Sequence, residues 1–156
     1  FSTIESVEET KDIIKYCTYP SQGGKRGCGL VRQNKWGYDK LDKHRPIIIG
    51  QIETKTAIEK IWEFKEECEL DLFLIGPYDI SSSLGVAGQW DNKLYIKYIN
   101  EIYRTFPLNK LGLFLSNEEI KKFDSTKEYP YFLVWGIDVS LIKENLNNMK
   151  NNSYGN

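Results

Sequence analysis

Short apolar runs alternate with amphipathic segments from residue 45 onwards, and this alternation limits the folds open to the chain. The predicted strands are 47–52, 70–75, 111–115 and 131–135, and the predicted helices that follow them are 54–67, 92–106, 117–123 and 139–149. Continuous apolar strands alternating with helices are typical of a parallel sheet covered by helices. Four such units predict either half of an eight-unit barrel or a small open doubly wound sheet, and periodicity does not distinguish the two.

The first 44 residues are organised differently. Ser6, with Glu9 three residues later, predicts the start of a helix that ends near residues 19–20. A glycine-rich segment, 22–29, follows and is interpreted as a functional loop. Within it, Lys25 and Arg26 are candidates to bind a phosphate or a distal carboxylate of a substrate, and a surface turn with structural contacts only is an equal alternative.

Composition narrows the class of protein. The chain has 156 residues, with 21 Lys and Arg against 22 Asp and Glu, for a net charge of −1. We expect one domain over residues 1–150 and a disordered tail over 151–156. The balanced charge argues against nucleic acid as a partner, and no apolar run approaches the roughly 20 residues that span a membrane. Three cysteines without metal-ligand spacing favour a reducing, cytoplasmic location.

Polar side chains stand at the carboxyl ends of the predicted strands, which converge on one rim in a parallel α/β sheet. They are Gln51, Glu53, Asp79, Ser116 and Asp138. Gln51 and Glu53 point to the same side of their strand because side chains alternate with a period of two. Two carboxylates on neighbouring elements suit Mg²⁺ or Mn²⁺. The alternative is that Glu53 and Asp79 only cap the helices that follow them.

Several motifs of this chain resemble those of a known family and occur in the order in which the family has them. They are Gln-Ile-Glu-Thr at 51–54, Leu-Ile-Gly-Pro-Tyr-Asp-Ile-Ser at 74–81, Ser-Leu-Gly at 83–85, the loop 19–27, Arg32 with Trp36-Gly37, and Val-Trp-Gly-Ile-Asp at 134–138. Together they resemble the HpcH/HpaI family of metal-dependent, class II pyruvate aldolases, from residue 1 to about residue 147. The resemblance implies that the chain is the C-terminal half of a TIM (β/α)8 barrel.

The resemblance also implies a reaction and its residues. The reaction would cleave or form a 2-keto-4-hydroxy acid, with pyruvate and a small aldehyde as partners. Glu53 and Asp79 would ligate the divalent metal, Mg²⁺ or Mn²⁺ with Co²⁺ as a further option. The metal would bind the 2-oxo group as a Lewis acid, and the N–H groups of Tyr78 and Asp79 would hold the pyruvate carboxylate. The residues expected to contact substrate are Gln51, which is also the catalytic candidate, Gly76, Pro77, Tyr78, Asp79, Arg26 and Phe114; a core position is the alternative for Phe114.

Departures from the family pattern are equally informative. The resemblance begins at the end of the family's fourth strand, so its histidine–acid pair and its arginine from earlier strands have no counterpart. His44 stands on the entry side of a strand and is expected on the surface. Residues 88–91, Gly-Gln-Trp-Asp, replace the family's His-Pro, which leaves the aldehyde open. We therefore expect a complementing N-terminal half-barrel or a homo-oligomer.

Two other functions remain open from the sequence. One is a non-catalytic half-barrel that serves as an assembly or regulatory module, because half a barrel leaves strand edges and an apolar sheet face to be covered. The other is an open-sheet phosphate-binding protein that uses residues 23–29. That loop, however, is predicted to follow a helix, whereas phosphate loops usually follow a strand.

Overall fold

Four parallel strands form a single sheet in the computed structural model, which describes residues 1–39, 45–115, 127–130 and 132–153. The strands are β1 (Ile49–Ile52), β2 (Leu72–Ile75), β3 (Leu111–Leu115) and β4 (Phe132–Trp135), and they lie in the order β1-β2-β3-β4. The predicted α/β class with a parallel sheet is confirmed. His44, Ser116 and the helix expected at 117–123 lie outside the described residues.

Helices occur at the predicted positions with shifted ends, and α4 (Pro77–Ser83) is an additional helix that was not predicted. They are α1 (Val7–Cys17), α2 (Lys55–Glu59), α3 (Ile61–Glu67), α4 (Pro77–Ser83), α5 (Lys93–Thr105) and α7 (Asp138–Ser153), with short 3-10 turns at Pro20–Gln22, Arg32–Gly37 and Leu108–Lys110. The helix expected over 54–67 is two helices, because the backbone of Lys60 leaves the helical conformation. Helix α7 runs to Ser153, past its expected end at residue 149, and so includes the first part of the segment expected to be a disordered tail.

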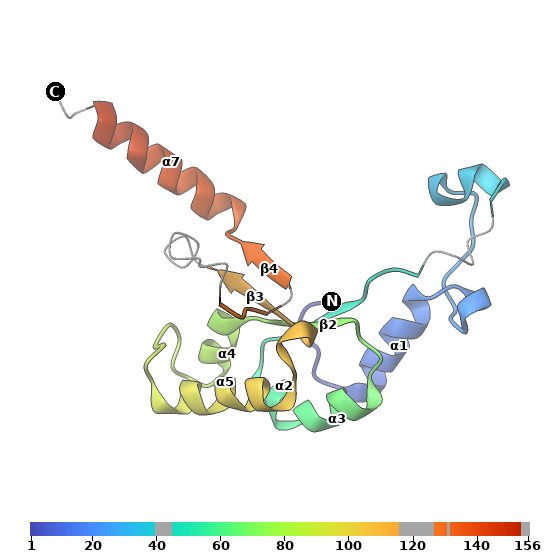
Figure 1. Ribbon diagram of the computed structural model, residues 1–156, viewed down its shortest axis with the longest axis horizontal. Coiled ribbons are helices and arrows are strands. Elements are labelled where there is room, and N and C mark those ends of the chain that lie inside the picture. Colours follow the sequence, from blue (N-terminus) through green and yellow to red (C-terminus); the bar gives the residue numbers. More distant parts are fainter. Residues whose placement is uncertain (40–44, 116–126, 131, 154–156) are drawn as a thin grey trace.

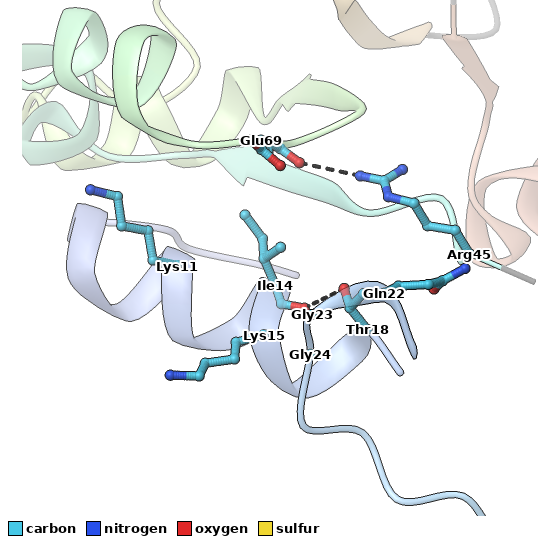
Figure 2. A pocket seen from close by; sticks show the side chains of 9 residues that line it. All are labelled: Lys11, Ile14, Lys15, Thr18, Gln22, Gly23, Gly24, Arg45 and Glu69. Carbon is cyan, nitrogen blue, oxygen red and sulfur yellow. Dashed lines mark hydrogen bonds between the residues drawn. The ribbon is translucent and has the colours of Figure 1, made fainter. Parts of the chain in front are cut away.

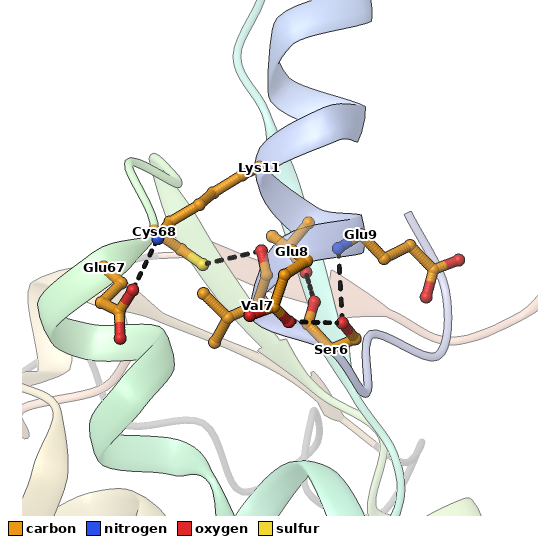
Figure 3. A network of polar contacts seen from close by, with 8 residues as sticks. Ser6, Val7, Glu8, Glu9, Lys11, Glu67 and Cys68 are labelled. Carbon is orange, nitrogen blue, oxygen red and sulfur yellow. Dashed lines mark hydrogen bonds and ion pairs between the residues drawn. The ribbon is translucent and has the colours of Figure 1, made fainter.

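The start of α1 follows the sequence prediction in part (Figure 3). The hydroxyl of Ser6 accepts a hydrogen bond from the N–H of Glu9, as expected for the first residue of a capping box. The Ser6 hydroxyl also donates to Oε2 of Glu8 at 3.0 Å, a bond between side chains that differs from the reciprocal bond of a capping box, in which the N–H of the first residue donates to the side chain three residues later. An ion pair of 2.5 Å between Lys11 and Glu67 then ties α1 to α3.

One face of the sheet packs against the helices and forms the core. Phe73, Ile75 and Leu111 of that face join the buried cluster, together with Ile61 and Phe64 of α3. Figure 1 shows α2, α3 and α5 along one side of the strands, while α7 extends from β4 away from the rest of the ribbon. No helix in the described parts of the chain is long and apolar enough to cross a membrane.

The two faces of the sheet are distinguished by the strand register. Gln51 of β1 is paired with Leu74 of β2, which is paired with Gly112 of β3. These residues share the face opposite the helical core, and Leu74 is absent from the core cluster although it is buried. Side chains at alternate positions, including Glu53 and Phe114, belong to this second face.

Candidate active site

The carboxyl ends of β1 and β2 bring three of the predicted site residues together. The N–H of Gly76 donates a 2.9 Å hydrogen bond to the carbonyl of Ile52, so Gly76 continues the ladder beside Glu53. A β-carbon at Gly76 would lie 2.8 Å from Cγ of Glu53 and 3.3 Å from Nε2 of Gln51. Glycine is therefore required there for the side chains of Gln51 and Glu53 to occupy this corner of the sheet.

Neither candidate carboxylate caps the helix that follows it. Thr54 is the N-cap of α2, and its hydroxyl accepts a hydrogen bond from the N–H of Ala57 at 3.2 Å. Gly76 is the N-cap of α4, and no side chain caps that helix. Neither residue is therefore an N-cap, although Asp79 does stand in the first turn of α4, where a negative charge is favourable.

The two carboxylates differ in their surroundings. Glu53 is buried, with 9% of its surface exposed, and its Oε2 accepts a 2.6 Å hydrogen bond from the hydroxyl of Thr3. Asp79 lies in the first turn of α4 and is exposed. Sequence reasoning did not find Thr3, because it belongs to no motif and is 50 residues away from Glu53 along the chain.

The first turn of α4 presents backbone donors beside these side chains. Pro77 is the first helical residue, and the N–H of Ile80 bonds to the carbonyl of Gly76. The N–H groups of Tyr78 and Asp79 precede the first intrahelical bond and have no carbonyl one turn back. These two donors were expected from the sequence resemblance to hold the carboxylate of pyruvate.

An aromatic cluster stands next to this turn. The rings of Tyr78 and Trp90 meet edge to face with their centres 6.4 Å apart, and those of Trp90 and Tyr95 do so at 5.4 Å. Tyr78 and Trp90 are at least half exposed. Trp90 belongs to the segment 88–91 that departs from the family pattern, so the departure lies close to Tyr78.

The serine that ends the second motif and the serine that begins the third have structural roles. The hydroxyl of Ser81 donates to the carbonyl of Tyr78 and accepts from the N–H of Gly88 at 3.0 Å, which holds the loop after α4 against that helix. The hydroxyl of Ser83 accepts from the N–H of Lys55 at 2.9 Å, which joins α4 to the start of α2. Both bonds stabilise the backbone that follows the two strand ends.

Of the two remaining predicted contact residues, Phe114 lies on the sheet face of the candidate site and Arg26 does not. Phe114 is half-buried on β3, on the same sheet face as Gln51 and Glu53. Arg26 lies elsewhere: its guanidinium stacks 4.7 Å from the ring centre of Tyr19, beyond the end of α1. Within this chain, the structure does not bring Arg26 to the corner that holds Glu53.

The surroundings of the glycine-rich loop show which end of the sheet it occupies (Figure 2). Gly23 and Gly24 line a cavity of about 410 Å³ together with Arg45 and Glu69. Arg45 precedes β1 and Glu69 precedes β2, so this cavity lies at the amino ends of the strands. The loop and the candidate site therefore occupy opposite ends of the sheet.

The described parts of the chain contain no group of three or more His, Cys, Asp or Glu side chains that could hold a metal ion. Buried Glu53 lies at this corner, and exposed Asp79 lies in the first turn of the helix that follows β2. A site with two carboxylates fits Mg²⁺ or Mn²⁺, which retain several water ligands and accept substrate oxygens. The donor set is therefore compatible with the expected metal.

The chain is therefore an α/β protein with a parallel sheet, and its candidate site lies at the carboxyl ends of the strands. No family model matches the chain. Among curated proteins it is similar to a hydroxypyruvate/pyruvate aldolase of Roseobacter denitrificans (29% identity over 92 residues), a 4-hydroxy-2-oxovalerate aldolase of Novosphingobium aromaticivorans (33% over 89 residues) and a 2-keto-3-deoxy-L-rhamnonate aldolase of Salmonella paratyphi A (26% over 154 residues). These alignments cover 55%, 54% and 93% of this chain, and 36%, 34% and 57% of the relatives.

Solved structures show the same fold. An HpcH/HpaI aldolase/citrate lyase family protein from Burkholderia cenocepacia superposes with a TM-score of 0.79 at 19% identity, over 98% of this chain and 63% of that one. An HpcH/HpaI aldolase from Desulfitobacterium hafniense gives a TM-score of 0.77 at 20% identity, over 97% and 61%. The resemblance to the HpcH/HpaI aldolases is thus confirmed over part of their length, and the chain has the fold of a partial barrel.

Proposed function

We propose that this chain carries the metal-binding part of a divalent-metal-dependent aldolase, a carbon–carbon lyase that cleaves or forms a 2-keto-4-hydroxy acid. Its products in the cleavage direction would be pyruvate and a small aldehyde. The similarity to three curated aldolases supports the general class of reaction. The chain spans only about a third to three-fifths of the length of those relatives, so the substrates and the activity are carried over as part of the proposal.

The observation that carries this proposal is the contact at Gly76. Its α-carbon lies so close to Glu53 and Gln51 that a methyl group there would collide with Cγ of Glu53 at 2.8 Å. Residues of the two motifs therefore converge on one point of the rim where ligands bind in parallel α/β folds. Asp79 follows three residues later on the adjacent helix.

Glu53 and Asp79 would hold Mg²⁺, Mn²⁺ or Co²⁺ at this corner. When bound there, the ion would supply Lewis-acid polarisation of the substrate 2-oxo group. The N–H groups of Tyr78 and Asp79 would hold the carboxylate of pyruvate by hydrogen bonds. The amide of Gln51, adjacent to Glu53, would orient the bound 2-oxo acid, and Phe114 would supply an apolar wall on the same face of the sheet.

Residues outside this chain would complete the reaction. The family resemblance implies a histidine–acid pair that moves the proton and an arginine that contacts the pyruvate oxygens. We therefore propose that full turnover needs a complementing N-terminal half-barrel or an oligomeric partner. The three thiols, Cys17, Cys28 and Cys68, are free, which supports the proposal of a reducing cytoplasmic location.

The test measures pyruvate release from 4-hydroxy-2-oxo acids, coupled to reduction by lactate dehydrogenase, with and without added divalent metal. We expect EDTA to abolish turnover, and Glu53→Gln and Asp79→Asn each to lower kcat/KM by about 100-fold, equivalent to about 2.7 kcal/mol. The matched control is Glu66→Gln, an exposed glutamate of α3. Undiminished turnover in the two site variants would contradict the proposal.

A binding measurement covers the case in which the isolated chain does not turn over. Titration with Mn²⁺, followed by the electron paramagnetic resonance signal of the free ion, reports on the site without catalysis. We expect the full chain to bind Mn²⁺ and both site variants to bind it at least about 10-fold more weakly. Equal binding by the wild type and both variants would count against a metal site at this corner.

A second candidate function is favoured by one observation on α7. Val139, Ile142, Leu146 and Met149 repeat at helical spacing, and each is more than half exposed. An apolar stripe of this kind is typical of an interface, so we propose as the alternative that the half-barrel is a non-catalytic assembly module that pairs with a second copy of itself. Light scattering should then give a dimer mass that Ile142→Lys reduces to the monomer mass, and a wild-type monomer would rule this alternative out.

A further inference from the structure

The first four residues form an additional edge segment beside β1. The amino group of Phe1 donates to the carbonyl of Ile49 at 2.8 Å, and the N–H of Gln51 donates to the carbonyl of Phe1 at 2.8 Å. The N–H of Ile4 then donates to the carbonyl of Gln51 at 3.2 Å. The segment is therefore held by β1 along the length that leads to Gln51.

This pairing contains one extra residue. In a regular parallel ladder, the two hydrogen bonds of one residue reach positions that are two apart on the neighbouring strand. The two bonds of Gln51 instead reach Phe1 and Ile4, which are three apart. The intervening pair, Ser2 and Thr3, thus forms a β-bulge, a feature that changes the direction of a side chain.

Thr3 bears the conformational cost of this bulge. Its φ angle is +53°, in the left-handed region that β-branched residues rarely adopt. A residue held in this region is strained, and such strain persists only where the surrounding structure maintains it. Glycine would adopt the same backbone without that cost, so the threonine side chain is the part of this residue that needs an explanation.

The threonine hydroxyl reaches the buried carboxylate of the candidate site. It donates to Oε2 of Glu53 at 2.6 Å. The other oxygen, Oε1, lies 3.3 Å from the position that a β-carbon on Gly76 would take, so it faces the corner shared with β2. The two oxygens of Glu53 are therefore distinguished, one bonded to Thr3 and the other directed to the neighbouring strand end.

We propose that Thr3 is a positioning residue for the divalent-metal site: its strained backbone holds the hydroxyl against Oε2 of Glu53 and so leaves Oε1 to ligate the cation. The inference rests on the proposed function, because it assigns Thr3 a role through Glu53. Groups that bond to a metal ligand in this way orient it, and their loss typically lowers metal affinity by about 10- to 100-fold.

The experiment titrates the full 156-residue chain with Mn²⁺ and measures the free ion by electron paramagnetic resonance. Thr3→Gly removes the hydroxyl and relieves the strain, and Thr3→Ser keeps the hydroxyl. We expect Thr3→Gly to weaken Mn²⁺ binding by at least about 10-fold, with a thermal midpoint equal to or above that of the wild type, and Thr3→Ser to stay within about threefold. The matched control is Thr105→Val, which loses a 2.8 Å hydroxyl bond to the carbonyl of Glu101 in α5.

The outcomes separate this inference from the proposed function. If the wild type binds Mn²⁺ and Glu53→Gln loses it, while Thr3→Gly and Thr3→Ser both bind as the wild type does, the role of Thr3 is overturned and the metal site stands. If Glu53→Gln binds Mn²⁺ as tightly as the wild type, the metal site and the role of Thr3 both fail. If Thr105→Val weakens binding as much as Thr3→Gly, the effect is one of general stability and the positioning role is also overturned.

Discussion

The N–H of Lys55 donates a 2.9 Å hydrogen bond to the hydroxyl of Ser83, so the first turn of α2 is fastened to the last turn of α4. Each of these helices follows a strand whose end carries a candidate site residue, Glu53 after β1 and Gly76 after β2. The bond therefore helps to fix the distance between the ends of β1 and β2, because it joins the helices that follow them.

Replacement of Ser83 tests this connection. Ser83→Ala leaves the N–H of Lys55 without its partner, and we expect the free energy of unfolding in urea to fall by about 1 kcal/mol. Ser82→Ala is the matched control, because Ser82 is an exposed neighbour on the same helix and should stay within about 0.5 kcal/mol of the wild type. Equal losses in the two variants would show that the Ser83 bond adds nothing specific.

Gly76→Ala should affect the site more than the fold. Its φ of −101° is accessible to alanine, but the added methyl would lie 2.8 Å from Cγ of Glu53. We expect the carboxylate to be displaced and Mn²⁺ affinity to fall by about 10-fold or more. Gly27→Ala serves as the control, since no atom lies within 4 Å of its added β-carbon, and its Mn²⁺ affinity should match that of the wild type.

Asp71 should make stability depend on pH in the acid range. Burial raises the pKa of its carboxyl, but hydrogen bonds from the N–H of Ile48 and the guanidinium of Arg45, at 2.7 and 2.6 Å, outweigh burial and hold the pKa below the ordinary 3.8. A carboxyl whose pKa is lower in the folded state contributes stability above its unfolded pKa, and that contribution is lost as the pH falls through the folded value.

We therefore expect Asp71→Asn to lower stability at pH 7 by about 1–2 kcal/mol and to flatten the decline in stability below about pH 4. Urea unfolding from pH 7 down to pH 2.5 measures both effects. Asp12→Asn, an exposed change on α1, should retain the slope of the wild type. An Asp71→Asn profile parallel to that of the wild type would contradict the assigned role.

The cysteines should differ in reactivity. Burial raises the pKa of the Cys68 thiol, whose sulfur lies 4.0 Å from the carbonyl oxygen of Val7, whereas Cys28 is exposed. Since the thiolate is the reactive form, iodoacetamide at pH 7.5 should modify Cys28 well before Cys68. Peptide mass spectrometry over time measures the order, and a Cys68 that reacts as fast as Cys28 would show that the α1–α3 contact opens readily.

The sequence was sufficient to predict which residues lie at the strand ends, but it did not predict the helix boundaries around them. Gln51 and Glu53 could be placed on one side of a strand because side chains alternate, and Asp79 could be placed after the end of the next strand because parallel strands end at one rim. No helix was predicted directly after the second strand, although proline suits the first helical position and Pro77 here begins α4. The break at Lys60 has no glycine or proline to signal it.

Arg26 shows how topology limits inference from motifs. Its loop follows α1, and a helix between parallel strands returns the chain to their amino ends, so the loop lies beside residues that precede β1 and β2. The motif match instead predicted that Arg26 contacts the substrate, and the structure does not place it at the candidate site. Thr3 is the opposite case, because only the three-dimensional structure shows that an unremarkable residue near position 1 bonds to Glu53.

The bulge at Thr3 determines where this chain can be cut when it is fused to the upstream strands of another barrel. A fusion that joins upstream strands of another protein to this chain just before α1, which begins at Val7, would still include Glu53 and Asp79. Such a fusion would lack residues 1–4 and therefore the hydrogen bond from Thr3 to Glu53. A graft that begins at or before Phe1 would keep the hydrogen bond from Thr3 to Glu53.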